Sequence, residues 1–313
     1  MLSINNLTIV MYHYVRPIKN SRFPRIKGLE LEGFRRQLDY LSNKYNFINA
    51  ERLIGCALGA EDLPKNSCFL TFDDGYKDHI QYVMPELLSR GIQGSFFPPV
   101  NAVLKRDMLD VNAIHLILAA VSPEDIDGVC VDINNVMYDY GYSMSEVLDF
   151  QRIWTVSGRY DPPKVMYFKH ILQHVLPSGV RGEIISKLFK KYVGVSQSDY
   201  SEELYLSLSD TKKLIECGMY IGSHGAQHIW LDKESKITQR SEIDSSLQFL
   251  QKVGAPIKNW IMCYPYGAYN EDTLSILREK ECAIGLTTKV GLAEVDPSKI
   301  FELKRFDTND FPR

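Results

Sequence analysis

The six cysteines of this 313-residue chain form no Cys-x-x-Cys pair, and most of them lie in apolar runs. This distribution is typical of buried free thiols and supports neither a zinc-thiolate site nor a disulfide framework. Residues 1–6 lack a basic segment followed by an apolar stretch, and the first apolar run, residues 7–14, is too short to cross a bilayer. We therefore expect a cytoplasmic protein in a reducing compartment, without an integral membrane segment.

The chain also lacks an excess of positive charge, because its net charge is −3 and its pI is about 6.2. This balance excludes the broad basic surface that binds nucleic acid or anionic membranes. The expected substrate is neutral, or is contacted only locally. No internal repeat or low-complexity tract is visible, and 45% apolar residues are enough to form a large core.

Strand-like and helix-like segments alternate in residues 1–100 and 209–313, which predicts a parallel sheet covered by helices. The expected strands are residues 7–14, 67–70, 94–98, 219–222, 260–263, 283–288 and 300–303. The expected helices are residues 29–44, 50–57, 77–90, 210–217, 235–253 and 271–281. The fold class is thus predicted to be α/β.

Residues 101–208 interrupt this alternation and read as a mainly helical insertion, with helices at about 110–121, 143–153, 163–176 and 180–192. The insertion could serve as a lid or a partner surface. It contains His170 and His174 at the spacing of helical zinc sites. The apolar stripe of that helix predicts that both histidines face solvent instead, and Ile171 stands where zinc proteases carry a glutamate.

Two adjacent carboxylates, Asp73 and Asp74, follow the apolar run of residues 67–70 in the motif Thr71-Phe72-Asp73-Asp74-Gly75-Tyr76. Adjacent acids at the end of a buried strand repel each other, so a cation or a shared proton is expected beside them. The alternative reading of an isolated Asp-Asp-Gly is a surface turn.

His224 and His228 follow another expected strand, in Ser223-His224-Gly225-Ala226-Gln227-His228, and their spacing predicts one face of a helical turn. Because the carboxyl ends of parallel strands meet on one rim, the acids and the imidazoles should converge there. Two imidazoles and one carboxylate suit Zn²⁺ or another first-row divalent metal.

These motifs, together with Tyr264-Pro265-Tyr266-Gly267, resemble those of the polysaccharide deacetylases with NodB homology, carbohydrate esterase family 4. The resemblance covers roughly residues 7–100 and 209–306. It implies a distorted (β/α)7 barrel, a metal held by Asp74, His224 and His228, and Asp73 as the catalytic base that acts on a metal-bound water. It also points to the backbone N–H of Tyr266 as the donor to the developing oxyanion.

The sequence departs from the family pattern in two places. Where many members carry an arginine that pairs with the base, this chain has Cys263, and we expect Arg305 to fill that role; the alternative is a surface arginine. No histidine follows His228, although members commonly place a general acid near the C-terminus. His13, or Asp73 returning its proton, would then protonate the leaving amine.

The leading interpretation is a hydrolase that removes N-acetyl or N-formyl groups from an amino sugar of a glycan or glycan precursor. The same site would also serve a carbohydrate O-acetyl esterase, since a metal and a base act on both bonds. A third reading is a carbohydrate-binding barrel without turnover, favoured by Cys263 and the missing histidine.

Overall fold

The computed structural model describes residues 6–312, apart from the side chain of His174. Residues 1–5, on which the expectation about an export signal partly rests, lie outside the described residues. The chain forms two compact units. The first contains Met1–Pro17, Gly28–Arg106 and Leu204–Arg313, and the second contains Ile18–Lys27 and Asp107–Glu203. The second unit therefore includes a short N-terminal segment in addition to the helical stretch.

The first unit contains the strands. They are β1 (Asn6–Tyr12), β2 (Val15–Arg16), β3 (Leu29–Glu30), β4 (Asn46–Phe47), β5 (Ser67–Asp73), β6 (Ser95–Phe97), β7 (Tyr220–Ile221), β8 (Trp260–Cys263), β9 (Cys282–Leu286), β10 (Ala293–Glu294) and β11 (Phe306–Asp307). All seven residues of β5 are buried, as expected for a central parallel strand that is covered on both faces. The prediction of an α/β fold is confirmed.

A seven-stranded sheet runs in the order β10-β1-β5-β6-β7, with β11 added beside β1 and β4 beside β5. The pairings β1–β5, β5–β6, β6–β7 and β1–β11 are parallel. Strands β8 and β9 form a separate parallel pair. Isolated parallel bridges join Ser223 to Met262 and Leu286 to Leu303. The ladders among the described residues are therefore linked by single bridges rather than closed into one continuous sheet.

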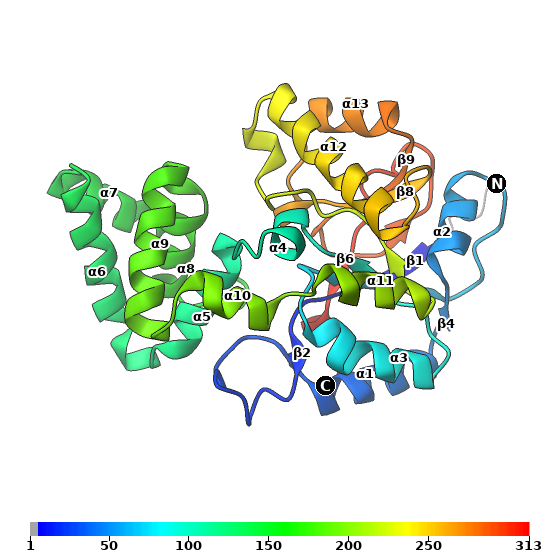
Figure 1. The fold of residues 1–313 in the computed structure, drawn as a ribbon, viewed down its shortest axis with the longest axis horizontal. Helices are drawn as coiled ribbons and strands as arrows, with labels where there is room; N and C mark the ends of the chain where they lie inside the picture. Colours follow the sequence, from blue (N-terminus) through cyan, green and yellow to red (C-terminus); the bar gives the residue numbers. More distant parts are fainter. Residues whose placement is uncertain (1–5, 313) are drawn as a thin grey trace. The chain divides into compact units, whose positions relative to one another are not determined.

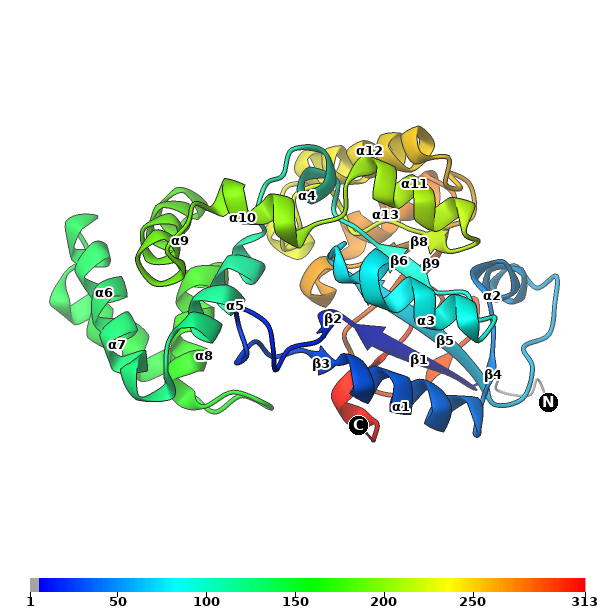
Figure 2. The ribbon, with the colours of Figure 1, turned by 60° about the horizontal axis from the view of Figure 1, so that its bottom comes forward.

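Helices cover these strands, with α1 and α3 on one side and α12 and α13 on the other (Figures 1 and 2). They are α1 (Leu31–Ser42), α2 (Ala50–Ala57), η1 (His79–Val83), α3 (Met84–Ser89), α4 (Val100–Leu104), α11 (Leu208–Glu216), η4 (Leu231–Lys233), α12 (Lys236–Val253), η5 (Pro265–Gly267), α13 (Glu271–Glu279) and η6 (Thr308–Asp310). Asn49, Ser207 and Ser235 cap α2, α11 and α12, since each side chain accepts a hydrogen bond from a backbone N–H of the first turn.

The single helix expected at residues 77–90 is divided into the π-helix η1 and the α-helix α3. Pro85 has no N–H to donate to the preceding turn, which fits a change of helical geometry at this point. The strand expected at residues 300–303 is absent. The backbone turns there, with the N–H of Glu302 donating to the carbonyl of Lys299, and only Leu303 forms a bridge.

The second unit is helical, and its helices pack side by side (Figure 1). They are α5 (Asp110–Ala120), η2 (Pro123–Asp125), α6 (Ile126–Asp139), α7 (Met144–Trp154), α8 (Pro163–His170), η3 (Ile171–Val175), α9 (Ser178–Val193) and α10 (Gln197–Leu204). The sequence analysis did not anticipate α6 or α10. Gly128 lies in α6 and weakens its helical pattern, yet burial of Val129, Ile133 and Met137 compensates for it.

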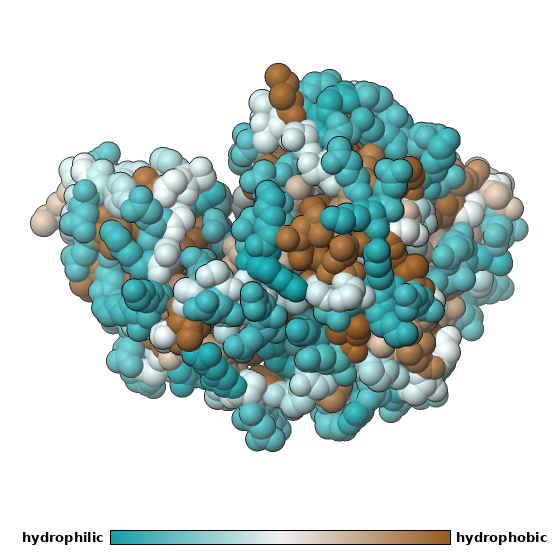
Figure 3. Space-filling model, in the orientation of Figure 1, coloured by the Kyte–Doolittle hydropathy of each residue, from teal (hydrophilic) through white to brown (hydrophobic). Residues whose placement is uncertain are grey.

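The cysteines are unpaired, and the surface is of mixed polarity. All six cysteines are free thiols. Hydrophilic residues cover most of the face drawn in Figure 3, with hydrophobic residues in smaller groups between them. Within the described part of the chain, none of the helices combines the length and the apolar character needed to cross a membrane.

Candidate active site

The two adjacent acids lie at the buried end of β5, and not in a surface turn. Asp73 is its last residue, and Asp73 and Asp74 are only 1% and 3% exposed. The chain reverses at once because Asp74 and Gly75 both have a φ of 69°. A Cβ at Gly75 would lie 2.7 Å from Cβ of Pro98, so glycine is required for space as well as for conformation. The tight turn directs the two carboxylates toward different partners.

The loop after β7 brings the two histidines to Asp74. Nε2 of His224 and Nε2 of His228 each lie 3.4 Å from Oδ1 of Asp74. The expectation that they share a helical turn is wrong, because residues 222–230 form an irregular loop. Gly225 and His228 adopt positive φ values of 71° and 57°, which fold the loop back on itself.

A metal ion would compete with protons for these side chains. Burial lowers the pKa of His224, but Cys263, Asp74 and Asp73 outweigh it and raise that pKa well above its usual value. Nδ1 of His224 is 2.7 Å from the carbonyl oxygen of Cys263, which makes Nδ1 an N–H donor and leaves Nε2 as the nitrogen that faces Asp74. Burial lowers the pKa of His228 to about 4, so its imidazole is neutral. Burial raises the pKa of Asp74, but the hydrogen bond to His224 and the charges of His228 and His13 bring it well below its usual value.

Asp74, His224 and His228 therefore offer a carboxylate oxygen and two imidazole nitrogens within 4.8 Å of one another, a set that could hold a divalent metal ion. Tyr76 donates its hydroxyl to Oδ2 of Asp74 at 2.6 Å and orients that carboxylate. The tyrosine follows the Asp-Asp-Gly motif directly, but its role was not anticipated from the sequence. Its ring stacks on Tyr14 at 4.1 Å between centroids, which fixes its position.

Asp73 is held by Arg305, which follows Leu303 and its bridge to β9. Nη1 of Arg305 is 3.0 Å from Oδ1 and Nη2 is 2.9 Å from Oδ2, so the guanidinium contacts both carboxylate oxygens. The Nε–H of Arg305 donates to the carbonyl of Thr287 at 2.8 Å. Burial raises the pKa of Asp73, but Arg305, His224 and His13 outweigh it and lower that pKa overall.

Asp73, His224 and Cys263 form a second group whose donor atoms lie within the same range. This group is less suited to a cation, because Arg305 already places a positive charge against both oxygens of Asp73. Burial also raises the pKa of the Cys263 thiol, and the thiol would have to ionise to bind a metal. Sγ of Cys263 lies 3.4 Å from Oδ2 of Asp73 instead.

The turn after β8 places Tyr266 beside the histidines. Tyr266 has φ 58° and ψ 4° within η5, so its backbone is held in a left-handed conformation. Its ring lies parallel to that of Trp230 with centroids 4.4 Å apart, and meets the ring of His228 edge-on at 4.6 Å. The third sequence motif thus borders the histidine motif.

His13 is the first residue after β1. Its carbonyl oxygen is 3.2 Å from Nε2 of His79, and its imidazole acts on the pKa of both Asp73 and Asp74. The side chain of His13 is half-buried, so it combines contact with the site and access to solvent.

Glu242 holds the loop of residues 222–230, which carries both histidines, but the sequence analysis did not identify it. Oε2 accepts the backbone N–H groups of Ala226 and Gln227 at 2.8 and 2.9 Å, and Oε1 accepts the side-chain amide of Gln227 at 2.8 Å. Its position in the buried stripe of α12, with Gln239, Ser246 and Phe249, is the signal that could have identified it. A carboxylate in such a stripe needs local donors.

The chain is similar to known proteins in part of its sequence and in its fold. The profile of a family described as polysaccharide deacetylase matches residues 191–284. The structure is similar to that of deacetylase PplD from Streptococcus pyogenes in complex with acetate, with a TM-score of 0.57, 16% identity and coverage of 96% of this chain and 92% of the other. It is also similar to IcaB from Ammonifex degensii, with a TM-score of 0.56, 16% identity and coverage of 96% and 91%.

A third similar structure is the BpsB deacetylase domain from Bordetella bronchiseptica, with a TM-score of 0.55, 14% identity and coverage of 97% of this chain and 96% of the other. At these identities the likeness establishes the fold. No protein among the curated sequences gives a significant match.

We predict that Glu242→Ala weakens Zn²⁺ binding by about 10- to 100-fold, because it leaves three donors without their carboxylate and frees the loop that carries both histidines. Glu242→Gln can still accept hydrogen bonds and should stay within about threefold of the parent protein. Glu234→Ala, an exposed substitution that precedes the same helix, is the matched control. Competition titration against a zinc chelator measures the affinity. Equal affinity in all four proteins would show that Glu242 does not position the ligands.

Proposed function

We propose that this chain is a metal-dependent hydrolase that removes N-acetyl or N-formyl groups from an amino sugar of a glycan or glycan precursor, which the match of residues 191–284 to the polysaccharide deacetylase profile supports. The observation that supports the proposal is that the two adjacent acids contact different partners. Asp74 faces two imidazoles, whereas Asp73 faces a guanidinium. One carboxylate is thereby suited to metal binding and the other to proton transfer.

We also propose that the strands correspond to a distorted (β/α)7 barrel, with residues 101–208 as a helical insertion within it. Six of the barrel strands would be β1, β5, β6, β7, β8 and β9, and residues 303–307 would form the seventh. The parallel bridges at Ser223–Met262 and Leu286–Leu303, and the pairing of β11 with β1, support this reading. In such a barrel the three motifs share the rim at the carboxyl ends of the strands.

In this proposal Asp74, His224 and His228 hold the metal, for which we favour Zn²⁺ because the set combines two imidazoles with one carboxylate. The bound ion would supply Lewis acidity to water and to the scissile carbonyl. Tyr76 keeps the carboxylate of Asp74 in place, and the carbonyl of Cys263 fixes the tautomer of His224.

Asp73 acts as the general base. Its lowered pKa keeps the carboxylate ionised at neutral pH, so it can accept the proton of the attacking water. Arg305 orients both oxygens of Asp73 and in return limits its basicity. The backbone N–H of Tyr266 would donate to the developing oxyanion, since Pro265 has no N–H to offer.

The leaving amine must receive a proton, and the half-buried His13 is our proposed donor. Asp73 returning the proton that it accepted is the alternative. The six free cysteines support a reducing compartment, and hence a substrate that is met inside the cell, such as a nucleotide-linked or lipid-linked sugar.

Two other functions fit parts of the site. An O-acetyl esterase would use the same metal and base, and is favoured if acetate is released faster from O-acetyl than from N-acetyl sugars. A carbohydrate-binding barrel without turnover would explain Cys263, but the ion pair between Arg305 and Asp73 provides a partner for the base despite that cysteine.

We predict that the protein releases acetate and a free amine from N-acetylated nucleotide sugars or oligosaccharides, and that a chelator abolishes the reaction until Zn²⁺ is restored. Asp73→Asn removes the base and should lower kcat by about 10²- to 10⁴-fold, without a matching loss of metal. Amine formation and bound zinc are measured on the same samples. Full activity in Asp73→Asn, or activity that persists in chelator, would contradict the proposal.

Arg305→Gln should raise the pKa of Asp73, because burial then acts without the opposing guanidinium. Activity needs ionised Asp73, so it is present above that pKa and is lost as the pH falls through it. The acid limb of the kcat/KM profile should therefore move to higher pH in Arg305→Gln, with a lower plateau. Arg278→Gln, at an exposed position of α13, is the control. An unchanged turnover and pH profile in Arg305→Gln would exclude a role for Arg305.

His13→Gln should lower kcat for N-acetyl substrates by about 10²-fold or more if His13 protonates the leaving amine. The loss should be smaller for O-acetyl substrates, since an alcohol leaving group depends less on protonation. Turnover of the two substrate classes is compared in the same preparation. Normal kcat in His13→Gln removes the residue from the mechanism and leaves Asp73 as the proton donor.

A further inference from the structure

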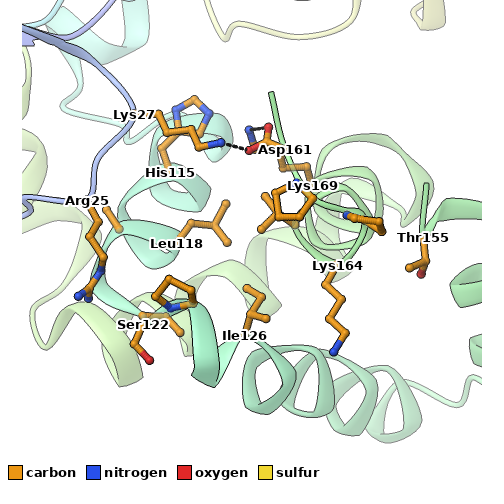
Figure 4. Close-up of a pocket in the computed structure, with 16 residues that line it drawn as sticks. Arg25, Lys27, His115, Leu118, Ser122, Ile126, Thr155, Asp161, Lys164 and Lys169 are labelled. Carbon is orange, nitrogen blue, oxygen red and sulfur yellow. Dashed lines mark hydrogen bonds and ion pairs between the residues drawn. The ribbon is translucent and has the colours of Figure 1, made fainter. Parts of the chain in front are cut away.

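The helical unit contains a cavity of about 610 Å³, within the range of about 300–1,000 Å³ that is common for small-molecule sites. It is formed by the end of α5, the link into α6, the start of α8 and the segment that carries Arg25 and Lys27, all within this unit (Figure 4). None of its residues belongs to the candidate active site, so the cavity is a separate feature.

The sequence of α5 explains why the cavity exists. This helix is apolar around most of its circumference, with Ile114 and Ile117 fully buried in the unit. Leu118 lies on another side and is only half-buried, so it lines the cavity instead of packing in the core. Ile126 and Val165 line the cavity in the same half-buried state. Such an apolar surface favours the binding of an apolar group, because binding removes both apolar surfaces from water.

Positive charge surrounds these apolar side chains. In Figure 4, Leu118 and Ile126 lie between Arg25 on one side and Lys164 and Lys169 on the other, with Lys27 above. Lys27 and Lys169 share the single carboxylate of Asp161, at 2.6 and 2.7 Å, and Lys164 pairs with Asp127 at 2.5 Å. Arg25 donates to the neutral carbonyl of Ala120 at 2.9 Å. Two acids thus offset only two of the four cations.

The chemistry of the lining also argues against a sugar. Among the described residues the lining includes no Phe, Tyr or Trp ring for a sugar to stack on, and no amide side chain of Asn or Gln. Its other polar side chains are the hydroxyls of Ser122 and Thr155 and the imidazole of His115. An occupant should therefore have a hydrocarbon body and a negatively charged end.

We propose that this cavity binds an amphiphilic anion, a single hydrocarbon chain that ends in a phosphate or a carboxylate. The hydrocarbon chain of the ligand lies against Leu118, Ile126 and Val165, and its anionic end meets Arg25. This site is independent of the proposed deacetylase function and would exist without it.

The full-length protein is titrated with decyl phosphate and with decanoate by calorimetry, below their micelle concentrations. We expect saturable binding of one molecule per chain, and the tighter of the two ligands identifies the head group. Inorganic phosphate and decyltrimethylammonium, which supply the anion or the tail alone, should bind at least about tenfold more weakly. Equal binding of either one overturns the proposal, as does the absence of binding by both anionic amphiphiles.

Two variants locate the site. Leu118→Asn should weaken decyl phosphate binding by about tenfold, because it places a polar group against the chain. Arg25→Gln, at an exposed position, should weaken decyl phosphate binding by about threefold. Lys190→Gln, an exposed lysine of α9 outside the cavity, should leave binding unchanged. Circular dichroism checks that each variant is folded. Equal affinity in all three variants would place any binding elsewhere and refute the assignment.

Discussion

Two buried negative charges on adjacent residues are the constraint on which the site depends. Asp73 and Asp74 lie at the end of a fully buried strand, where an isolated carboxylate would cost several kcal/mol of folding free energy. Each acid has its own partners, since a guanidinium contacts Asp73 and two imidazoles and a phenol contact Asp74. Because the partners differ, the two carboxylates acquire different chemistry from the same motif.

The partners come from distant parts of the chain, so the fold has to deliver them. The histidines arrive on an irregular loop that Glu242 of α12 holds through backbone N–H groups, and α4 adds hydrogen bonds to the carbonyls of Gly225 and Ala226. Arg305 arrives on the last segment of the chain and is anchored by the carbonyl of Thr287. Contacts of this kind behind the site keep the imidazoles and the Asp73 carboxylate in place.

The helical unit uses apolar surface differently. Its core is built from α5 and α9, which pack against each other, but α5 has more apolar surface than that contact covers. The remainder lines a cavity with lysines and an arginine at its edge. In the helical unit, one side of an apolar helix thus borders a cavity with cations at its edge. In the sheet-containing unit, by contrast, the apolar strands are covered on both faces.

The sequence by itself determined the α/β class, the resemblance to polysaccharide deacetylases and the four side chains that meet at the candidate site, because strand periodicity and the spacing of Asp, His and Gly are local properties. It did not determine the conformation of the histidine loop, where positive φ values at Gly225 and His228 replace the expected helical turn. It also did not reveal Tyr76 or Glu242 as supports, or the turn at residues 300–303. These features depend on contacts between residues far apart in the chain, such as Arg305 with Asp73, and only the tertiary structure decides which buried charge meets which partner.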